Sequence, residues 1–397
     1  MSGFSLYVHI PYCVAKCPYC DFNSYAARQW PEQRYVAALC REMGHYAELA
    51  PWRGGEIKTI FFGGGTPSLF AATSIGAILD EAARRWTIAA DVEVTLEANP
   101  GTVALDGLRG FRAAGVNRMS FGVQSFVPRH LQTLGRIHSG EEAVAAVQGA
   151  RAAGFARVSL DLIYALPEQT MAEWESDLAR ACALQPDHIS AYNLTYEEGT
   201  PFHQWRAQGK LRNLPEEIEV AMFTGTQETL QAAGYRQYEI SNYAQPDQAC
   251  RHNLNYWQSG DYLGIGAGAH SYTRVAALES ESSGTDVSPV DCWGRRWSDE
   301  KNPGRYLAAI ESEGHARVTS ETLDARQARG EFVFLGLRCI EGFAAETFRA
   351  RFGADLPELF PQVSDLCDGG LLECRNQRWR LTPQGLLLAD SVFATFL

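Results

Sequence analysis

Stretches with β-strand patterning alternate with stretches of α-helix patterning along the first 233 residues. The strand-like stretches are residues 6–10, 59–62, 92–96, 118–123, 158–165 and 189–195, and the helix-like stretches are residues 31–49, 74–86, 105–114, 141–153, 171–184 and 215–233. Such alternation predicts a parallel sheet whose strands are joined by crossover helices. Three helix-like stretches end in Ala-Ala-Gly, at residues 113–115, 152–154 and 232–234, and glycine is the usual residue at a helix C-terminus. We therefore expect an α/β fold, a partial (β/α)6 TIM-like barrel.

The patterning changes after Tyr243. Residues 250–257 and 264–270 are loop-like, and residues 279–303 are rich in Ser, Gly, Pro and charge, as in a surface insert. Residues 371–374 and 379–381 form a hairpin-like pair, followed by one final helix over residues 383–396. We expect a barrel with a motif-bearing loop over residues 1–272, a surface insert or linker over 273–304, and a small C-terminal α+β, winged-helix-like domain over 305–397.

The charge balance excludes several classes of partner. The chain has 35 basic and 47 acidic side chains and a formal net charge of −12, whereas unspecific binding to nucleic acid or anionic lipid needs clustered Lys and Arg. No run of about 18 apolar residues is long enough to span a membrane, and Met1 to Phe4 do not begin a signal peptide. We expect a soluble cytoplasmic protein with no nucleic-acid partner and no integral membrane segment.

Three of the ten cysteines lie together, at Cys13, Cys17 and Cys20. The other seven are scattered, and we expect most of them to pack as small apolar residues. A short loop with three thiols can surround one soft metal centre. Zinc is one alternative, in an interaction module, but structural zinc takes four protein ligands and no fourth Cys or His completes the loop. Three thiolates on a four-iron cluster would leave one iron open for a substrate or cofactor.

The unusual residues follow the ends of the expected strands. The cysteines come after the first strand, the Gly63-Gly64-Gly65-Thr66 turn after the second, Glu97 after the third and Gln124 after the fourth, while Asp161 lies in the fifth. In parallel barrels the carboxyl ends of the strands form the active face. One pocket should therefore collect all of these side chains.

The Cys-x3-Cys-x2-Cys spacing, with Tyr19 before the last cysteine, resembles the signature of radical S-adenosylmethionine (radical SAM) proteins. The resemblance implies a [4Fe-4S] cluster on Cys13, Cys17 and Cys20 and S-adenosylmethionine on the open iron. It extends over the whole chain to the family of oxygen-independent coproporphyrinogen III dehydrogenase, through the motifs at residues 7–13, 63–66, 118–126, 134–138 and 161–167. On that resemblance the contacts to S-adenosylmethionine fall on Tyr7, Tyr19, Gly64, Gly65, Thr66, Glu97, Gln124, Arg136 and Asp161. The plainer alternatives are a tight glycine turn, a helix-capping carboxylate and a solvated arginine.

Two departures separate the chain from the dehydrogenase itself. That enzyme has a fourth cysteine where this chain has Phe22, and it has a longer segment before the cluster, whereas 12 residues precede Cys13 here. Both features resemble the HemW-like branch of radical SAM haem chaperones, and so does the run from His252 to Trp257, which reads His-Asn-Leu-Asn-Tyr-Trp. The resemblance implies that His252 ligates haem. Two alternatives are a hydrogen-bonded loop histidine and ligation by Cys250.

The resemblance implies a chaperone that binds a [4Fe-4S] cluster, S-adenosylmethionine and haem. It would deliver haem to acceptor haemoproteins, such as those of the respiratory chain. The alternative is a radical SAM enzyme of porphyrin metabolism, either of the coproporphyrinogen III dehydrogenase type or a methylase. Sequence leaves open whether the chain is an enzyme, and we expect no coproporphyrinogen III dehydrogenase activity. A homodimer that depends on the cluster is a further expectation.

Overall fold

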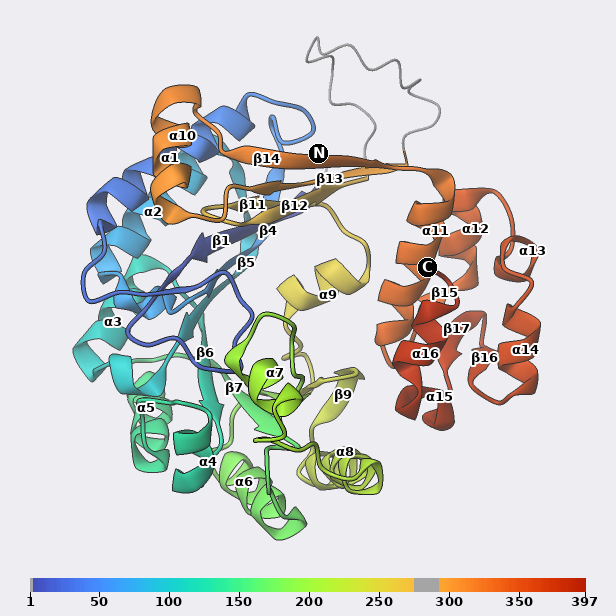
Figure 1. Cartoon of the computed structure of the whole chain (residues 1–397). Helices are drawn as coiled ribbons and strands as arrows, with labels where there is room; N and C mark the ends of the chain where they lie inside the picture. The colour runs from blue at the N-terminus through green and yellow to red at the C-terminus, as the bar shows by residue number, and fades with distance from the viewer. Residues whose placement is uncertain (1–2, 275–292) are drawn as a thin grey trace.

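The computed structural model describes residues 3–274 and 293–397. Six parallel strands form the centre of a large sheet in the order in which they occur along the chain (Figure 1). They are β1 (Gly3–Ile10), β4 (Glu56–Gly64), β5 (Thr87–Ala98), β6 (Arg118–Gln124), β7 (Arg157–Tyr164) and β8 (His188–Asn193). All six strands predicted from the sequence are confirmed.

Helices connect these strands and cover the outer face of the sheet (Figure 1). The principal ones are α1 (Glu32–Ala47), α2 (Ala72–Arg85), α3 (Leu105–Ala114), α5 (Gly140–Ala152), α6 (Met171–Ala183) and α8 (Glu216–Ala232). Two short helices, α4 (Pro128–Thr133) and α7 (Pro201–Ala207), lie between them. The predicted glycine stops are confirmed, since Gly115, Gly154 and Gly234 have φ of 113°, 88° and 89°.

The sheet continues beyond the six predicted strands on both sides. Strand β11 (Tyr262–Ile265) pairs parallel with β1, and β12 (His270–Thr273), β13 (Gly294–Asp299) and β14 (Arg317–Leu323) extend that edge antiparallel. Strands β10 (Asn242–Ala244) and β9 (Arg236–Glu239) extend the other edge. Because β14 and β9 are the two ends of the twelve-stranded order, the barrel is open. The predicted partial barrel is confirmed. Of the two stretches expected to be loop-like, residues 266–269 do form a turn between β11 and β12, whereas residues 251–257 form a helix, so the loop expected there was wrong.

The C-terminal residues form a small α+β domain with its own three-stranded antiparallel sheet, in the order β15–β17–β16, as expected. Its elements are α11 (Ala325–Arg338), β15 (Phe343–Ala344), α12 (Ala345–Phe352), α13 (Leu356–Leu359), α14 (Val363–Asp368), β16 (Leu372–Arg375), β17 (Arg378–Leu381), α15 (Pro383–Leu387) and α16 (Ala389–Ala394). The single final helix predicted over residues 383–396 is instead two helices that meet at Leu388, where φ is −115° and ψ is 25°.

Two large clusters of buried apolar residues support these parts. One lies between the barrel strands and their outer helices, and the other fills the C-terminal domain and extends to Tyr272 of β12 and Leu323 of β14. The predicted insert contributes β13 to the sheet, and its residues 275–292, Cys292 among them, lie outside the described residues. The division at residues 273–304 stays a prediction. Across the described ranges, no helix combines the length and the apolar character that crossing a membrane requires.

Candidate functional site

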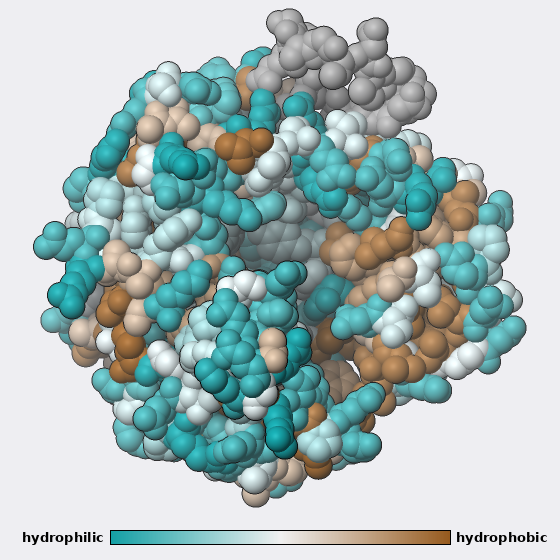
Figure 2. Space-filling view, in the orientation of Figure 1, coloured by the Kyte–Doolittle hydropathy of each residue, from teal (hydrophilic) through white to brown (hydrophobic). Residues whose placement is uncertain are grey.

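A cavity of about 1110 Å³ opens where the parallel strands end and extends toward the C-terminal domain. Figure 2 shows this hollow near the centre of the molecule, with hydrophobic side chains gathered over the C-terminal domain beside it. All thirteen site residues proposed from the sequence line this one cavity: Tyr7, Cys13, Cys17, Tyr19, Cys20, Gly64, Gly65, Thr66, Glu97, Gln124, Arg136, Asp161 and His252. Their convergence follows from the parallel topology. Their individual roles stay predictions.

The cysteine loop is held in place by backbone pairing on both of its sides. The short strands β2 (Tyr12–Cys13) and β3 (Tyr25–Ala26) pair in parallel across it, and the Phe202 amide donates to the Pro18 carbonyl at 3.0 Å. Lys16 Nζ donates to the carbonyls of Phe22 and Ser24, at 3.1 and 3.0 Å. The loop therefore has a fixed path, although it contains little regular structure.

Polar groups from other elements reach the thiols of this loop. Thr66 Oγ1 donates to Cys13 Sγ at 3.5 Å, and the Arg136 guanidinium donates to Cys17 Sγ at 3.6 Å. Burial raises the pKa of the Cys13 and Cys20 thiols. A cationic donor beside a sulfur stabilises a thiolate or sulfide ligand.

The thiols line one wall of the cavity without converging on a point. In the described parts of the chain, no three His, Cys, Asp or Glu side chains are grouped to hold one metal ion. The loop instead presents three part-buried sulfurs along the wall, with a buried Arg136 Nε that has no hydrogen-bond partner among the described residues. A cluster with several metal corners and anionic sulfurs would fit this donor set.

The glycine turn after β4 passes directly under the cysteine loop. A Cβ on Gly65 would lie 2.6 Å from the Tyr12 carbonyl oxygen, and one on Gly64, where φ is 109°, would lie 2.4 Å from the His9 ring. The Gly65 and Thr66 amides donate to the carbonyls of Ile10 and Tyr12, both at 2.8 Å. Only glycine permits this approach, and it brings backbone to the cavity wall for close contact with a ligand.

Two part-buried carboxyl groups, Glu97 and Asp161, lie on the floor of the cavity. Burial, assisted by the nearby Asp161 charge, raises the pKa of Glu97 to about 8. Burial also raises the pKa of Asp161, although Ser190 and Ser120 donate to it at 2.7 and 3.3 Å. Glu97 is therefore largely protonated at pH 7, and a bound cation or ammonium group would favour its ionisation.

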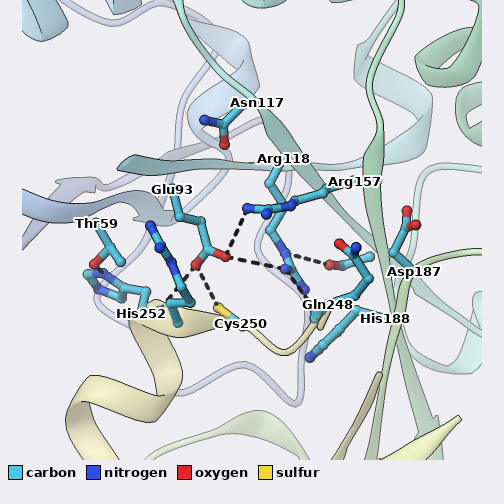
Figure 3. Close-up of polar contacts among 12 residues, drawn as sticks. Thr59, Glu93, Asn117, Arg118, Arg157, Asp187, His188, Gln248, Cys250 and His252 are labelled. Atoms are coloured by element: carbon cyan, nitrogen blue, oxygen red, sulfur yellow. Dashed lines mark hydrogen bonds and ion pairs between the residues drawn. The ribbon is translucent and has the colours of Figure 1, made fainter. Parts of the chain in front are cut away.

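His252 lies on α9 (Arg251–Trp257), which enters the barrel between β4 and the C-terminal domain (Figures 1 and 3). Thr59 Oγ1 donates its only proton to Ser5 at 2.7 Å, so it must accept from the Nδ1–H of His252, also at 2.7 Å. In that neutral tautomer Nε2 carries the lone pair, and it accepts from the Tyr256 hydroxyl at 2.9 Å. The side chain is 1% exposed, and burial lowers its pKa to about 3. In this conformation the lone pair that a metal would need is occupied by Tyr256.

A buried ion pair fixes the start of α9, and sequence reasoning missed it (Figure 3). Glu93 of β5 accepts from the His252 amide at 3.2 Å and from Cys250 Sγ at 3.6 Å, and it pairs with Arg118 of β6 at 3.4 Å. Burial raises the pKa of Cys250 to about 12, so the thiol stays protonated. The sequence signal was Glu93 between two valines of β5 and Arg118 at the start of β6.

The C-terminal domain contributes a second set of unforeseen lining residues. The junction of α15 and α16, over residues 386–391, forms part of the cavity wall, and Leu387 and Leu388 are 44% and 43% exposed there. An apolar wall opposite the polar barrel mouth suits a ligand with a large apolar face.

Comparisons with known proteins match this architecture. Residues 7–181 match the Radical SAM superfamily, and residues 323–388 match the HemN C-terminal domain. The chain is 39% identical over 400 residues to "Heme chaperone HemW" of Escherichia coli (strain K12), covering 100% of this chain and 99% of that protein. It is 35% identical over 398 residues to the protein of the same name from Bacillus subtilis (strain 168), covering 99% of both.

A solved structure shows the same fold over the whole chain. It is described as coproporphyrinogen III oxidase (HemN) from Escherichia coli, a radical SAM enzyme, and it aligns with a TM-score of 0.81 at 24% identity. The alignment covers 100% of this chain and 90% of that structure. At this identity the likeness concerns the fold alone.

Proposed function

Because the chain belongs to the HemW family of radical SAM proteins, we propose that it is a haem chaperone, which binds haem and delivers it to acceptor haemoproteins. The observation that carries the proposal is the 39% identity along the full chain to a protein named as a heme chaperone. The large cavity supports it, because it combines a thiol-lined wall with an apolar wall from the C-terminal domain.

The chaperone carries a [4Fe-4S] cluster on Cys13, Cys17 and Cys20. All three thiols line the cavity, and Arg136 provides a cation beside Cys17. The cluster supplies an open iron that can bind the amino and carboxylate groups of S-adenosylmethionine. The chain then orients that cofactor through the Gly64–Thr66 backbone and through Glu97. When a cation approaches, Glu97 loses its proton and becomes an anionic carboxylate that can pair with that cation.

Asp161, Gln124, Tyr7 and Tyr19 complete the contacts to S-adenosylmethionine. Asp161 is held by two serine hydroxyls, so its carboxylate is oriented before a ligand arrives. Gln124 has a φ of 67°, an uncommon backbone conformation for a non-glycine residue that recurs at functional sites. Respiratory haem enzymes are the acceptors we expect, and dimerisation that depends on the cluster remains part of the proposal.

Haem ligation by His252 carries a structural condition. Its Nε2 must first release the Tyr256 hydroxyl, because both nitrogens of the His252 ring are hydrogen-bonded in this structure. A rotation of the Tyr256 side chain away from His252 Nε2 would satisfy that condition. A His252→Ala variant that keeps the wild-type haem spectrum would exclude the ligand role.

The function is tested by haem binding followed by transfer. Protein reconstituted anaerobically with iron and sulfide should develop a Soret band with added haem and pass that haem to an apo acceptor. The triple variant Cys13→Ala/Cys17→Ala/Cys20→Ala should lose the iron and sulfide and lose transfer. Wild-type protein that binds no haem, or retains it in the presence of every apo acceptor tried, would overturn the proposal. His203→Ala, on α7 and away from the cavity wall, is the matched control.

A further inference from the structure

Four hydrogen-bonded side chains connect the barrel sheet to α9. Thr59 Oγ1 of β4 donates to Ser5 Oγ of β1 at 2.7 Å, and both of these side chains are buried. His252 Nδ1 donates to Thr59 Oγ1 at 2.7 Å (Figure 3), and the Tyr256 hydroxyl donates to His252 Nε2 at 2.9 Å. The imidazole therefore has one partner in the sheet and one partner on its own helix.

The contact with Thr59 decides which ring nitrogen can bind a metal. Because Thr59 donates its only proton to Ser5, it accepts from His252, and the imidazole proton stays on Nδ1. A metal-binding histidine almost always donates its other ring N–H to an acceptor, which fixes the tautomer and the ring orientation and makes the ligating nitrogen more basic. Thr59 supplies such an acceptor from the buried sheet, and sequence reasoning gave it no role.

The faces of the His252 ring are also in contact with aromatic side chains. Phe61, two residues along β4 from Thr59, stacks on the ring, with centroids 5.0 Å apart and an angle of 27° between the planes. Tyr256 lies edge-on to it, with centroids 5.0 Å apart and an angle of 88°. The sheet thus holds the imidazole in place while the Tyr256 hydroxyl occupies Nε2.

Tyr256 is placed so that it can move without disturbing the sheet. It is half-buried and lines both the large cavity and a smaller adjoining cavity of about 610 Å³. Its ring packs edge-on against Tyr262, with centroids 4.6 Å apart, and Tyr262 also lines the smaller cavity. Rotation of the Tyr256 side chain toward the smaller cavity uncovers His252 Nε2 and leaves the contact with Thr59 intact.

We propose that Thr59 is a positioning residue for haem ligation by His252, and that the Tyr256 hydroxyl competes with the haem iron for Nε2. The inference rests on the proposed function and adds the two groups that set how tightly the chaperone holds its cargo. The bond between iron and Nε2 forms as the hydrogen bond from Tyr256 breaks, and no proton is transferred. An ordinary hydrogen bond changes an affinity by about twofold to tenfold, a range that suits a carrier that must also release its ligand.

The competition is tested with Tyr256→Phe, which removes the hydroxyl and keeps the ring. The reconstituted variant should bind ferric haem about threefold to tenfold more tightly than the wild type and pass it more slowly to excess apomyoglobin. Its Soret band should keep the wild-type position, because the ligand is the same. Tyr196→Phe is the matched control, since the Tyr196 hydroxyl has no hydrogen-bond partner among residues 3–274 and 293–397. Wild-type affinity and transfer rate in Tyr256→Phe would show that the hydroxyl does not compete.

The positioning role is tested with Thr59→Val, which keeps the shape of the side chain and removes the acceptor at Nδ1. We expect haem binding about tenfold weaker and a displaced Soret band, whereas Thr59→Ser, which keeps a hydroxyl, should restore both. Thr95→Val is the matched control, because Thr95 is equally buried on the neighbouring strand β5 and its hydroxyl has no partner in the described parts of the chain. If Thr59→Ser binds haem as weakly as Thr59→Val, the hydroxyl is not what matters and the positioning role is wrong.

A measurement without haem checks the tautomer directly. In protein with isotopically labelled histidine, the His252 signal, assigned from its loss in His252→Ala, should show a proton on Nδ1 and none on Nε2. Thr59→Val should lose this preference and Thr59→Ser should keep it, and circular dichroism verifies that each variant is folded. A proton on Nε2 in the wild type would contradict the role of Thr59.

Failure of this inference differs from failure of the proposed function. If the wild type binds no haem, the proposed function fails and the inference falls with it. If the wild type binds and transfers haem but His252→Ala keeps the wild-type spectrum, the ligand is another residue, so the inference fails and the chaperone function stands.

Discussion

Glu42 of α1 and Asp299 of β13 bring two carboxyl groups into contact inside the barrel core. They are 0% and 1% exposed. Glu42 Oε2 accepts from the Tyr306 hydroxyl at 2.6 Å and from the Gly266 amide at 3.0 Å. Burial raises the pKa of Glu42 to about 7 despite these hydrogen bonds, and the pKa of Asp299 is raised by burial and by Glu42 although Arg317 opposes the shift. At least one of the two groups is therefore protonated in the folded protein near neutral pH.

This pair predicts a loss of stability between about pH 4.5 and pH 7. Above pH 4.5 the Glu42 side chain keeps its proton in the folded state and releases it in the unfolded state. The contribution of this proton to the free energy of unfolding is therefore complete below pH 4.5 and is lost as the pH rises to about 7. Glu42→Gln removes the titration of Glu42 and leaves that of Asp299, and the new amide can still accept from Tyr306 and donate to Asp299. The fall in unfolding free energy over this window should shrink by on the order of 2 kcal/mol in urea titrations. Glu313→Gln, exposed on α10 (Pro303–Glu313), is the control, and equal slopes in both variants would contradict the prediction.

Individual side chains were predictable from the sequence where position along a strand decides their place. Glu97 and Asp161 reach one cavity because both stand near the carboxyl ends of parallel strands. Glu93 pairs with Arg118 and with the start of α9, and this contact depends on the register between strands and on a segment more than 150 residues away. Both ring nitrogens of His252 are hydrogen-bonded, as the alternative of a hydrogen-bonded histidine predicts. Its role as a haem ligand stays a prediction.

At the scale of elements, the turn between β11 and β12 packs closely against β1 and against the segment that follows the cysteines. Gly266 has a φ of 102°, and a Cβ there would lie 2.4 Å from the His9 carbonyl oxygen. A Cβ on Gly268 would lie 2.4 Å from the Asn23 side chain. The turn thus sets the distance between β1, that segment and β12.

Gly266→Ala should therefore destabilise the protein more than a glycine substitution in open space. Alanine there combines an unfavourable positive φ with a clash against backbone, and we expect a loss on the order of 3 kcal/mol in unfolding free energy. Gly199→Ala is the control, because Gly199 has a φ of 86° but no atom within 4 Å of the added Cβ, and it should cost about 1 kcal/mol. Similar losses in the two variants would show that close packing at Gly266 adds nothing.

Periodicity explains which elements the sequence could predict. The six barrel strands and their six principal helices repeat one unit, and each was located to within five residues. The short elements β2, β3, α4 and α7 fall outside that repeat and were not predicted. Strands β11 and β12 were missed because the glycines in and between them resemble a loop, although Gly266 and Gly268 of the turn pack closely against His9 and Asn23. The break at Leu388 was missed because Pro383 to Phe396 has unbroken helical patterning, while the structure turns Leu387 and Leu388 toward the cavity.

At the scale of the whole molecule, Arg338 at the end of α11 joins the C-terminal domain to the barrel. Its guanidinium lies 4.5 Å from the centre of the Trp257 ring and 3.7 Å from the fully buried Glu239 carboxylate. Backbone bonds accompany it, from the Ile240 amide to the Arg338 carbonyl and from the Ile340 amide to the Tyr238 carbonyl, both at 3.1 Å. The motif that begins at His252 therefore ends on the interdomain contact.

Arg338→Ala should loosen this contact and leave Glu239 buried without its cation. Removing one partner of a buried ion pair costs about 3 kcal/mol, and the stacking on Trp257 adds about 0.5–1 kcal/mol. Arg338→Lys keeps the charge but loses the planar stacking, so its loss in urea unfolding should be intermediate. Limited proteolysis between β14 and α11 should accelerate in the same order, because that connection leads from one hydrophobic core to the other. Arg375→Ala, exposed on β16, should change neither measurement. Stability and proteolysis like the wild type in Arg338→Ala would mean that the other contacts between the domains, such as Arg351 with the Tyr272 hydroxyl and Arg296 with Glu331, hold them together without Arg338.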